Sequence, residues 1–125
     1  MTDLGVGKLP IEFLQLILAR YAGRDDRVVV GPQVGEDAAV LDMGDRYLVA
    51  KSDPITFASD QIGRYVVHVN ANDLATMGAQ PRWMLLTLLL PERATSRTLV
   101  EAIMDQVAGT CRSLGIVLCG GHTEI

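Results

Sequence analysis

The sequence predicts an α+β domain in which helices cover a sheet. Three observations support this fold class: apolar residues recur at helical spacing in two segments, alternate with polar residues around a glycine-containing turn, and form one almost wholly apolar run between two prolines. These patterns predict amphipathic helices, a hairpin and a buried strand, respectively. In chain order the elements are helix, strand, hairpin, helix, strand, helix and strand, which is typical of a two-layer architecture.

The first part of the chain is expected to form one helix and three strands. Pro10 lies in the first turn of the helix and Gly23 ends it. The valines at 28–30 predict a short strand, and segments 38–42 and 47–52 predict a hairpin around a turn at 43–46. The apolar face of the helix consists of Ile11, Leu14, Ile17, Leu18 and Tyr21.

A second helix is predicted from about Gln61 to Met77. Gly78 and then Pro81 end it, because a glycine can adopt the left-handed cap and a proline cannot continue a helix. Residues 83–90 follow as the apolar run, which predicts a strand buried on both faces.

Three residues are candidate N-caps of the third helix: Thr95, Ser96 and Thr98. Thr98 with Glu101 also fits a capping box, and the helix is expected to end at Gly115. Residues 116–119 then predict a last strand, which leads into a glycine turn at Gly120-Gly121.

Composition limits the classes of function. The 125 residues suit one domain, and 15 acidic against 11 basic residues give a net charge of −4, which argues against a nucleic-acid surface built on phosphate contacts. No apolar run approaches the roughly 20 residues of a membrane helix, and no secretory signal is visible at the N-terminus. Cys111 and Cys119 sit in apolar settings and are predicted to be buried free thiols of a cytoplasmic protein.

The second helix carries polar residues where an apolar helix should not. Asn70, Asn72 and Asp73 would cost free energy if buried without partners, so this segment either faces water or coordinates a ligand. The alternative is a satisfied polar network in a core or interface.

Two acidic segments lie upstream of this helix. Glu36 and Asp37 follow Gly35 at a loop-to-strand junction, where carboxylates can hold a hard cation such as Mg²⁺, although a solvated acidic turn has the same pattern. Asp53 ends a strand before Pro54 and either reaches into a site or caps a loop. We expect both segments to converge with the polar helix.

The glycine pair near the end of the sequence is the fourth candidate segment. Gly120 and Gly121 would let the backbone approach a phosphate closely, with the Thr123 hydroxyl and the Glu124 carboxylate nearby. The segment is not a Walker A motif, because no Gly-Lys-Ser/Thr is present. His122 is a candidate catalytic base, although a lone histidine is more often structural.

Together these motifs resemble the N-terminal domain of the aminoimidazole ribonucleotide (AIR) synthase-related superfamily. The resemblance covers about residues 35–125. This superfamily includes AIR synthase, thiamine-monophosphate kinase, selenophosphate synthetase and the hydrogenase maturation protein HypE. The SDPITFAS and NAND segments are most similar to HypE. The motifs, in order, are GEDAAVL, SDPITFAS, NANDLATMGAQPRW, LLLPE and GGHTEI.

The resemblance implies a mixed sheet covered by helices on one side, which pairs with the sheet of a second copy to form a barrel across a homodimer. It also implies ATP and Mg²⁺ as cofactors. Asp37, Asp53 and Asp73 resemble the aspartates that bind metal and phosphate. The positions that resemble nucleotide contacts are Gly35, Asn72, Gly120, Gly121 and Thr123.

The sequence departs from the family pattern at two points. Relatives place an acidic residue after the double glycine, whereas this chain has His122, with Glu124 as the candidate replacement. HypE acts on a thiocarbamoyl group at its own C-terminal cysteine, and no such cysteine is present here. Residues 1–125 are therefore expected to be one ATP-binding domain, lacking a C-terminal domain and unable to carry out that reaction alone.

Three functions remain open from the sequence. The first is the Mg²⁺–ATP-binding domain of a HypE-like protein, which dehydrates a carbamoylated cysteine during nickel–iron hydrogenase maturation and would have maturation proteins as partners. The second is ATP-dependent phosphoryl transfer or synthase chemistry on a small molecule, as in AIR synthase or thiamine-monophosphate kinase. The third is a non-catalytic dimerisation module. Only the first two would make the complete protein an enzyme.

Overall fold

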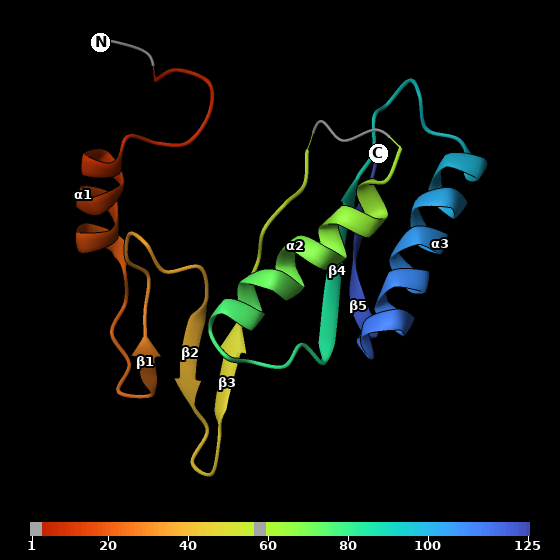
Figure 1. The fold of residues 1–125 in the computed structure, drawn as a ribbon. Helices are drawn as coiled ribbons and strands as arrows, with labels where there is room; N and C mark the ends of the chain where they lie inside the picture. The colour runs from red at the N-terminus through yellow and green to blue at the C-terminus, as the bar shows by residue number, and fades with distance from the viewer. Residues whose placement is uncertain (1–3, 57–59) are drawn as a thin grey trace. The chain divides into compact units, whose positions relative to one another are not determined.

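Helices and strands follow one another along the chain in the predicted order (Figure 1). The computed structural model describes residues 4–56 and 60–125, so residues 57–59 of the SDPITFAS motif lie outside the described residues. The chain divides into two units, Met1–Lys51 and Ser52–Ile125. The elements are α1 (Ile11–Tyr21), β1 (Val28–Val30), β2 (Ala39–Asp42), β3 (Tyr47–Ala50), α2 (Ile62–Thr76), β4 (Trp83–Leu89), α3 (Arg97–Leu114) and β5 (Val117–Glu124).

The first unit contains an antiparallel sheet with the strand order β1-β2-β3. The predicted hairpin is confirmed, with Ala39 opposite Ala50 and Asp42 opposite Tyr47. Its turn is closed by the Asp42 carboxylate, which accepts a hydrogen bond from the main-chain N–H of Gly44 at 2.8 Å. Gly44 has a φ of 97°, a conformation that side chains with a Cβ rarely adopt.

Helix α1 follows Pro10 as predicted but ends at Tyr21, two residues before Gly23. None of its residues is buried. Leu14, Ile17 and Leu18 are half-buried, whereas the first and last apolar residues of the predicted face are exposed. The helical spacing therefore predicted the helix correctly, while the apolar face is only partly covered.

The second unit is built on β4 and β5, which are parallel and joined through α3. A crossover helix is the usual connection between parallel strands, because a tight turn can join only antiparallel ones. Helices α2 and α3 pack together over one face of this pair (Figure 1). The buried core consists of Val67, Ala71, Leu86, Ile103, Val107, Cys111 and Ile116.

The expectation that residues 83–90 are buried on both faces is wrong for the described chain. Within β4 only Leu86 is buried, while Trp83, Leu85 and Leu89 are 66%, 73% and 73% exposed. Side chains alternate between the two faces of a strand, and both helices lie on the same face. The opposite face of β4 is an open apolar surface.

Of the three candidate N-caps of α3, Ser96 is confirmed, whereas the capping box at Thr98 and Glu101 is wrong. Ser96 is the N-cap of α3, and its hydroxyl accepts a hydrogen bond from the N–H of Leu99 at 3.1 Å. Because the helix already begins at Arg97, Thr98 lies inside the first turn. The predicted cap at Gly115 is confirmed, with a left-handed φ of 69°.

The predicted turn at Gly120-Gly121 is instead part of strand β5, which continues to Glu124. Gly120 lies opposite Leu85 and Gly121 opposite Leu86. A Cβ on Gly121 would run into the carbonyl oxygen of Leu86. Glycine is a weak strand former, so the sequence suggested a turn, but the close approach of β4 explains why glycine occurs here.

The two cysteines are free, as predicted, but only one is buried. Cys111 lies in the core with its sulfur 3.9 Å from the sulfur of Met84, and burial raises the pKa of its thiol. Cys119 is exposed, which corrects the expectation of two buried thiols. It lies at a register shift in β5, between Leu118 and Gly120.

No helix in the described ranges, 4–56 and 60–125, has the length and apolar character needed to cross a membrane.

Candidate nucleotide and metal site

The amide of Asn70 joins two of the predicted site segments. Its Oδ1 accepts a hydrogen bond from the main-chain N–H of Asp53 at 3.0 Å, and its Nδ2 donates to the Asp53 carbonyl, also at 3.0 Å. The same Nδ2 donates to the carbonyl of Val66, one helical turn earlier, at 2.8 Å. This network explains how a half-buried amide is tolerated in α2, and it confirms that the KSDP segment meets the polar helix.

Asp53 and Asp73 are brought to the same part of α2. Asp73 follows Asn70 by three residues, a spacing that puts two side chains on one helix face. This helix face therefore carries Asp73, and through Asn70 it also anchors the backbone of Asp53. Both aspartates are half-buried.

Asn72 occupies a different face of α2. It is exposed, so water satisfies its amide and no polar network of the core includes it. Near it, the Thr76 hydroxyl donates to the carbonyl of Asp73 at 2.8 Å, which is a bond within the helix. The role of Asn72 as a nucleotide contact stays a prediction.

Gly35 and Asp37 lie in the first unit, in the loop before β2. Gly35 has a φ of 91°, which explains the glycine, and the Glu36 N–H donates to the carbonyl of Gln33 at 3.3 Å. The Glu36 carboxylate accepts a hydrogen bond from the Gln33 side chain, also at 3.3 Å. Asp37 is exposed. The convergence of this loop with the other three segments stays a prediction.

The remaining predicted residues lie along β5 and divide between its two faces. His122 pairs with Thr87 on the open apolar face, and its Nε2 lies 3.7 Å from a Glu124 carboxylate oxygen. Thr123 pairs with Leu88, whose side chain packs against the core, and so faces the other way. His122 and Thr123 therefore cannot act from the same face of the strand.

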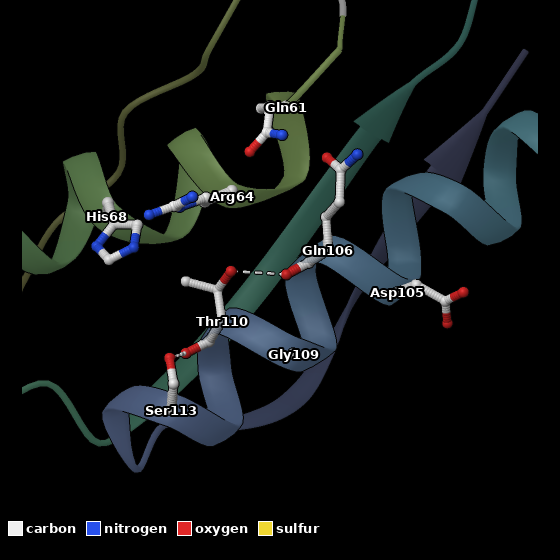
Figure 2. A pocket seen from close by; sticks show the side chains of 8 residues that line it. All are labelled: Gln61, Arg64, His68, Asp105, Gln106, Gly109, Thr110 and Ser113. Atoms are coloured by element: carbon white, nitrogen blue, oxygen red, sulfur yellow. Dashed lines mark hydrogen bonds between the residues drawn. The ribbon is translucent and has the colours of Figure 1, made fainter.

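A groove of about 360 Å³ lies between α2 and α3, and none of the predicted site residues lines it. Figure 2 shows that Arg64 and His68 line the groove from α2, and that Asp105 lines it from α3. The hydroxyls on α3 donate to carbonyls of their own helix, Thr110 to Gln106 at 2.7 Å and Ser113 to Thr110 at 2.8 Å. Because both hydroxyl groups already donate within α3, neither of these donors is available to a ligand in the groove.

Sequence reasoning missed the role of Gln106, which also lines this groove. Its Nε2 donates to the carbonyl of Asp60 at 2.8 Å, and its Oε1 accepts from the N–H of Gly63 at 3.1 Å. A Cβ on Gly63 would lie 2.5 Å from the Ile103 carbonyl oxygen, so a glycine is needed where the helices approach. No local signal could have revealed contacts that span more than 40 residues.

Within residues 4–56 and 60–125, no three His, Cys, Asp or Glu side chains are grouped closely enough to hold a metal ion. Two carboxyl groups on the exposed surface have lowered pKa values. The main-chain N–H of Arg27 lowers the pKa of Asp25, and the Arg46 guanidinium lowers the pKa of Asp45.

Residues 35–125 match the family described as AIR synthase related protein, N-terminal domain. The chain belongs to the AIR synthase-related family. The resemblance inferred from the five motifs is thereby confirmed, and the matched range agrees with the one that those motifs span.

Three relatives show the range of this family. The chain is 32% identical over 101 residues to a putative hydrogenase expression/formation protein of Methanocaldococcus jannaschii, covering 77% of this chain and 30% of that protein. It is 33% identical over 100 residues to carbamoyl dehydratase HypE of Escherichia coli, covering 72% and 30%. It is 30% identical over 118 residues to thiamine-monophosphate kinase of Salmonella typhimurium, covering 86% and 36%.

The solved structure of AaThiL complexed with AMPPCP and TMP has a similar fold, with a TM-score of 0.65 and 23% sequence identity. The similarity covers 73% of this chain and 32% of AaThiL. The chain thus spans about a third of the length of the relatives it matches. The predicted α+β fold of an AIR synthase-related N-terminal domain is confirmed.

Proposed function

We propose that this chain is the nucleotide-binding domain of an ATP-dependent enzyme that uses Mg²⁺. The observation that carries the proposal is the Asn70 amide, which holds the Asp53 backbone against the helix that bears Asp73. Family membership supports it, as does the complex of AaThiL with AMPPCP, an ATP analogue. Two unbridged cysteines are consistent with a cytoplasmic location.

The residues fit a magnesium ion in their chemistry. Mg²⁺ prefers oxygen ligands and usually takes one or two protein carboxylates together with waters and substrate phosphates. Asp53 and Asp73 would supply those carboxylates, and Asp37 is the third candidate. When bound, the ion would neutralise charge on the phosphates during transfer.

The nucleotide contacts proposed for this domain are the exposed amide of Asn72, the loop glycine Gly35, and the β5 residues Gly120, Gly121 and Thr123. The requirement for glycine at position 121 already has a cause within the sheet. Loss of binding in a Gly121 variant would therefore report on the fold as well as on the ligand. Asn72 is the better probe of direct contact, because its side chain is exposed.

The open face of β4 and β5 supports a homodimer as part of this proposal. Trp83, Leu85, Leu89 and Val117 expose apolar surface on adjacent parallel strands. Burying such side chains is favourable by about 25 cal/mol per Å² of apolar area, and a second copy offers a matching face with its sheet. We propose that the two sheets close into a barrel.

Light scattering or sedimentation would test the dimer. Leu85→Asp should convert the dimer to a monomer, because an unpaired carboxylate would be buried in the interface. Tyr21→Asp is the control, since Tyr21 is similarly exposed but lies on α1. A wild-type monomer, or equal behaviour of the two variants, would refute the barrel.

Two reactions fit the proposed site. A HypE-like protein would use ATP to dehydrate a carbamoyl group, with hydrogenase maturation proteins as partners, and a kinase-like protein would transfer a phosphoryl group to a small molecule. Relatives of both kinds match at about the same identity, 33% and 30%. His122 remains the candidate base, on the open face of β5. A non-catalytic dimer would keep the open face but bind no nucleotide.

Calorimetric titration with Mg²⁺–ATP, repeated with excess chelator, tests the nucleotide site. Asp73→Ala should weaken Mg²⁺-dependent binding at least tenfold while leaving the fold intact. Asp105→Ala is the matched control, because it removes a carboxylate from α3 that is not among the residues proposed for the site. Unchanged affinity in Asp73→Ala would sink the metal assignment, and a wild-type chain without binding would favour the non-catalytic dimer.

A further inference from the structure

We propose that Asn70 is a positioning residue, which holds Asp53 in the arrangement that the metal–nucleotide complex requires. This inference rests on the proposed function, since it assigns Asp53 to the metal. Asn70 itself would touch neither metal nor nucleotide. It would act through the backbone of Asp53, which it contacts at two points.

The amide of Asn70 bonds both main-chain polar groups of Asp53. Strand β3 ends at Ala50, so Asp53 lies beyond the sheet, and Pro54 has no N–H with which to continue a ladder. One side chain satisfies both the N–H and the carbonyl of Asp53, as a neighbouring strand would. Two contacts fix both the position and the rotation of that peptide segment.

The orientation of the amide is itself fixed. Nδ2 donates to two carbonyls, those of Asp53 and Val66, while Oδ1 accepts from one N–H. Turning the amide over would set its NH₂ group against the Asp53 N–H and its oxygen against two carbonyls. Because Val66 belongs to α2 itself, the Asn70 side chain is anchored to the helix before it reaches Asp53.

Proline further restricts Asp53. The residue before a proline is confined to extended backbone angles, because the proline ring clashes with the helical conformation. The main chain of Asp53 is therefore held by two hydrogen bonds from Asn70, and its backbone angles are limited by Pro54. Such preorganisation lowers the entropy lost when a carboxylate becomes a ligand.

Gln106 provides the matched control for this role. It also clamps a segment with two hydrogen bonds, at Asp60 and Gly63, but neither of these residues is a predicted ligand. If Asn70 were only structural, replacing Asn70 or Gln106 would have similar effects on ligand binding. If it positions Asp53, only the Asn70 variant should affect the metal.

The test is a double-mutant cycle on the intact protein, with calorimetric titration of Mg²⁺–ATP and of ATP in excess chelator. Asn70→Ala should weaken Mg²⁺-dependent binding about tenfold and Gln106→Ala less than twofold, with metal-free binding little changed in either. Asn70→Ala combined with Asp53→Ala should bind no more weakly than Asp53→Ala alone, because Asn70 acts through Asp53.

A second variant keeps the test usable if Asn70→Ala fails to fold. In Asn70→Ser the short hydroxyl can bond the Val66 carbonyl four residues earlier but cannot clamp Asp53. It should show the same loss of Mg²⁺-dependent affinity. With Mn²⁺ in place of Mg²⁺, paramagnetic broadening of the Asp53 amide resonance should be strong in the wild type and reduced in Asn70→Ser.

The outcomes separate the two proposals. If the wild type binds Mg²⁺–ATP but the Asn70 variants match Gln106→Ala, or if their effects add to that of Asp53→Ala, the positioning role is overturned and the nucleotide site stands. If the wild type binds no Mg²⁺–ATP, the proposed function fails, and the positioning role fails with it.

Discussion

Replacing Gly121 by alanine should destabilise the second unit more than any other single-methyl change in β5. Gly121 lies opposite Leu86, the one buried residue of β4. A Cβ at position 121 would overlap the Leu86 carbonyl oxygen and would lie 2.7 and 2.8 Å from the Leu86 carbonyl carbon and nitrogen. Ordinary contacts of a Cβ begin at about 3.4 Å, so the two strands would have to separate here.

The magnitude follows from what must move. The clash is with main-chain atoms, which cannot rotate away as a side chain can. Overpacking in a well-packed region costs about 1–3 kcal/mol, and each lost backbone hydrogen bond costs about 1 kcal/mol more. With one or two ladder bonds lost, Gly121→Ala should lower the free energy of unfolding by about 2–5 kcal/mol.

Gly120→Ala is the internal control. Its φ of 159° is close to the 153° of Gly121, so both alanines carry similar backbone strain. A Cβ at position 120 meets only the end of the exposed Leu85 side chain, at 3.2 Å, which can turn aside. The difference between the two variants therefore isolates the contact with the Leu86 backbone.

Urea denaturation followed by circular dichroism measures both variants. We expect Gly121→Ala to be at least about 2 kcal/mol less stable than Gly120→Ala. A difference below about 0.5 kcal/mol would refute the reasoning, because it would mean that β4 and β5 are not packed closely at this point.

Three further changes have defined outcomes. Ser96→Ala should cost about 1 kcal/mol in urea denaturation through loss of the N-cap, whereas Thr98→Ala should change stability by less than about 0.5 kcal/mol. Gly109→Ala should stabilise α3 by about 0.5–1 kcal/mol in the same assay, because alanine favours the helix and the nearest side-chain atom to the added Cβ, on Arg112, is 3.9 Å away. A loss of stability would contradict this. Iodoacetamide at pH 8 should alkylate Cys119 much faster than Cys111 by mass spectrometry, because burial raises the pKa of the Cys111 thiol; equal rates would contradict that placement.

Local patterns predicted the elements well because each depends on neighbours a few residues apart. Helical spacing placed α1 and α3, the stop signals at Gly78 and Pro81 marked the end of α2, and alternation around Gly44 placed the β2–β3 hairpin. The cap at Gly115 was predicted for the same reason, since a left-handed φ at a helix end is a local requirement.

The patterns failed where a partner distant in the sequence decides the conformation. Gly120-Gly121 suggested a turn, but pairing with β4 extends the strand through both glycines. The apolar run at 83–90 suggested burial on both faces, yet α2 and α3 lie on one face only. Composition shows that a segment is apolar but not which of its faces is covered.

The candidate site likewise has features that depend on neighbouring residues and features that depend on residues distant in the sequence. The sequence by itself determined the order of elements, the family, and the polar segment around Asn70 that an apolar helix would not carry, because motifs and periodicity are written in neighbouring residues. Only the tertiary structure decided that Asn70 binds the backbone of Asp53, 17 residues away, and that Gln106 binds Gly63, 43 residues away. Those contacts depend on how α2 packs against α3 and where each loop returns to the helices, and side-chain hydrogen bonds over such separations leave no periodic signal in the chain.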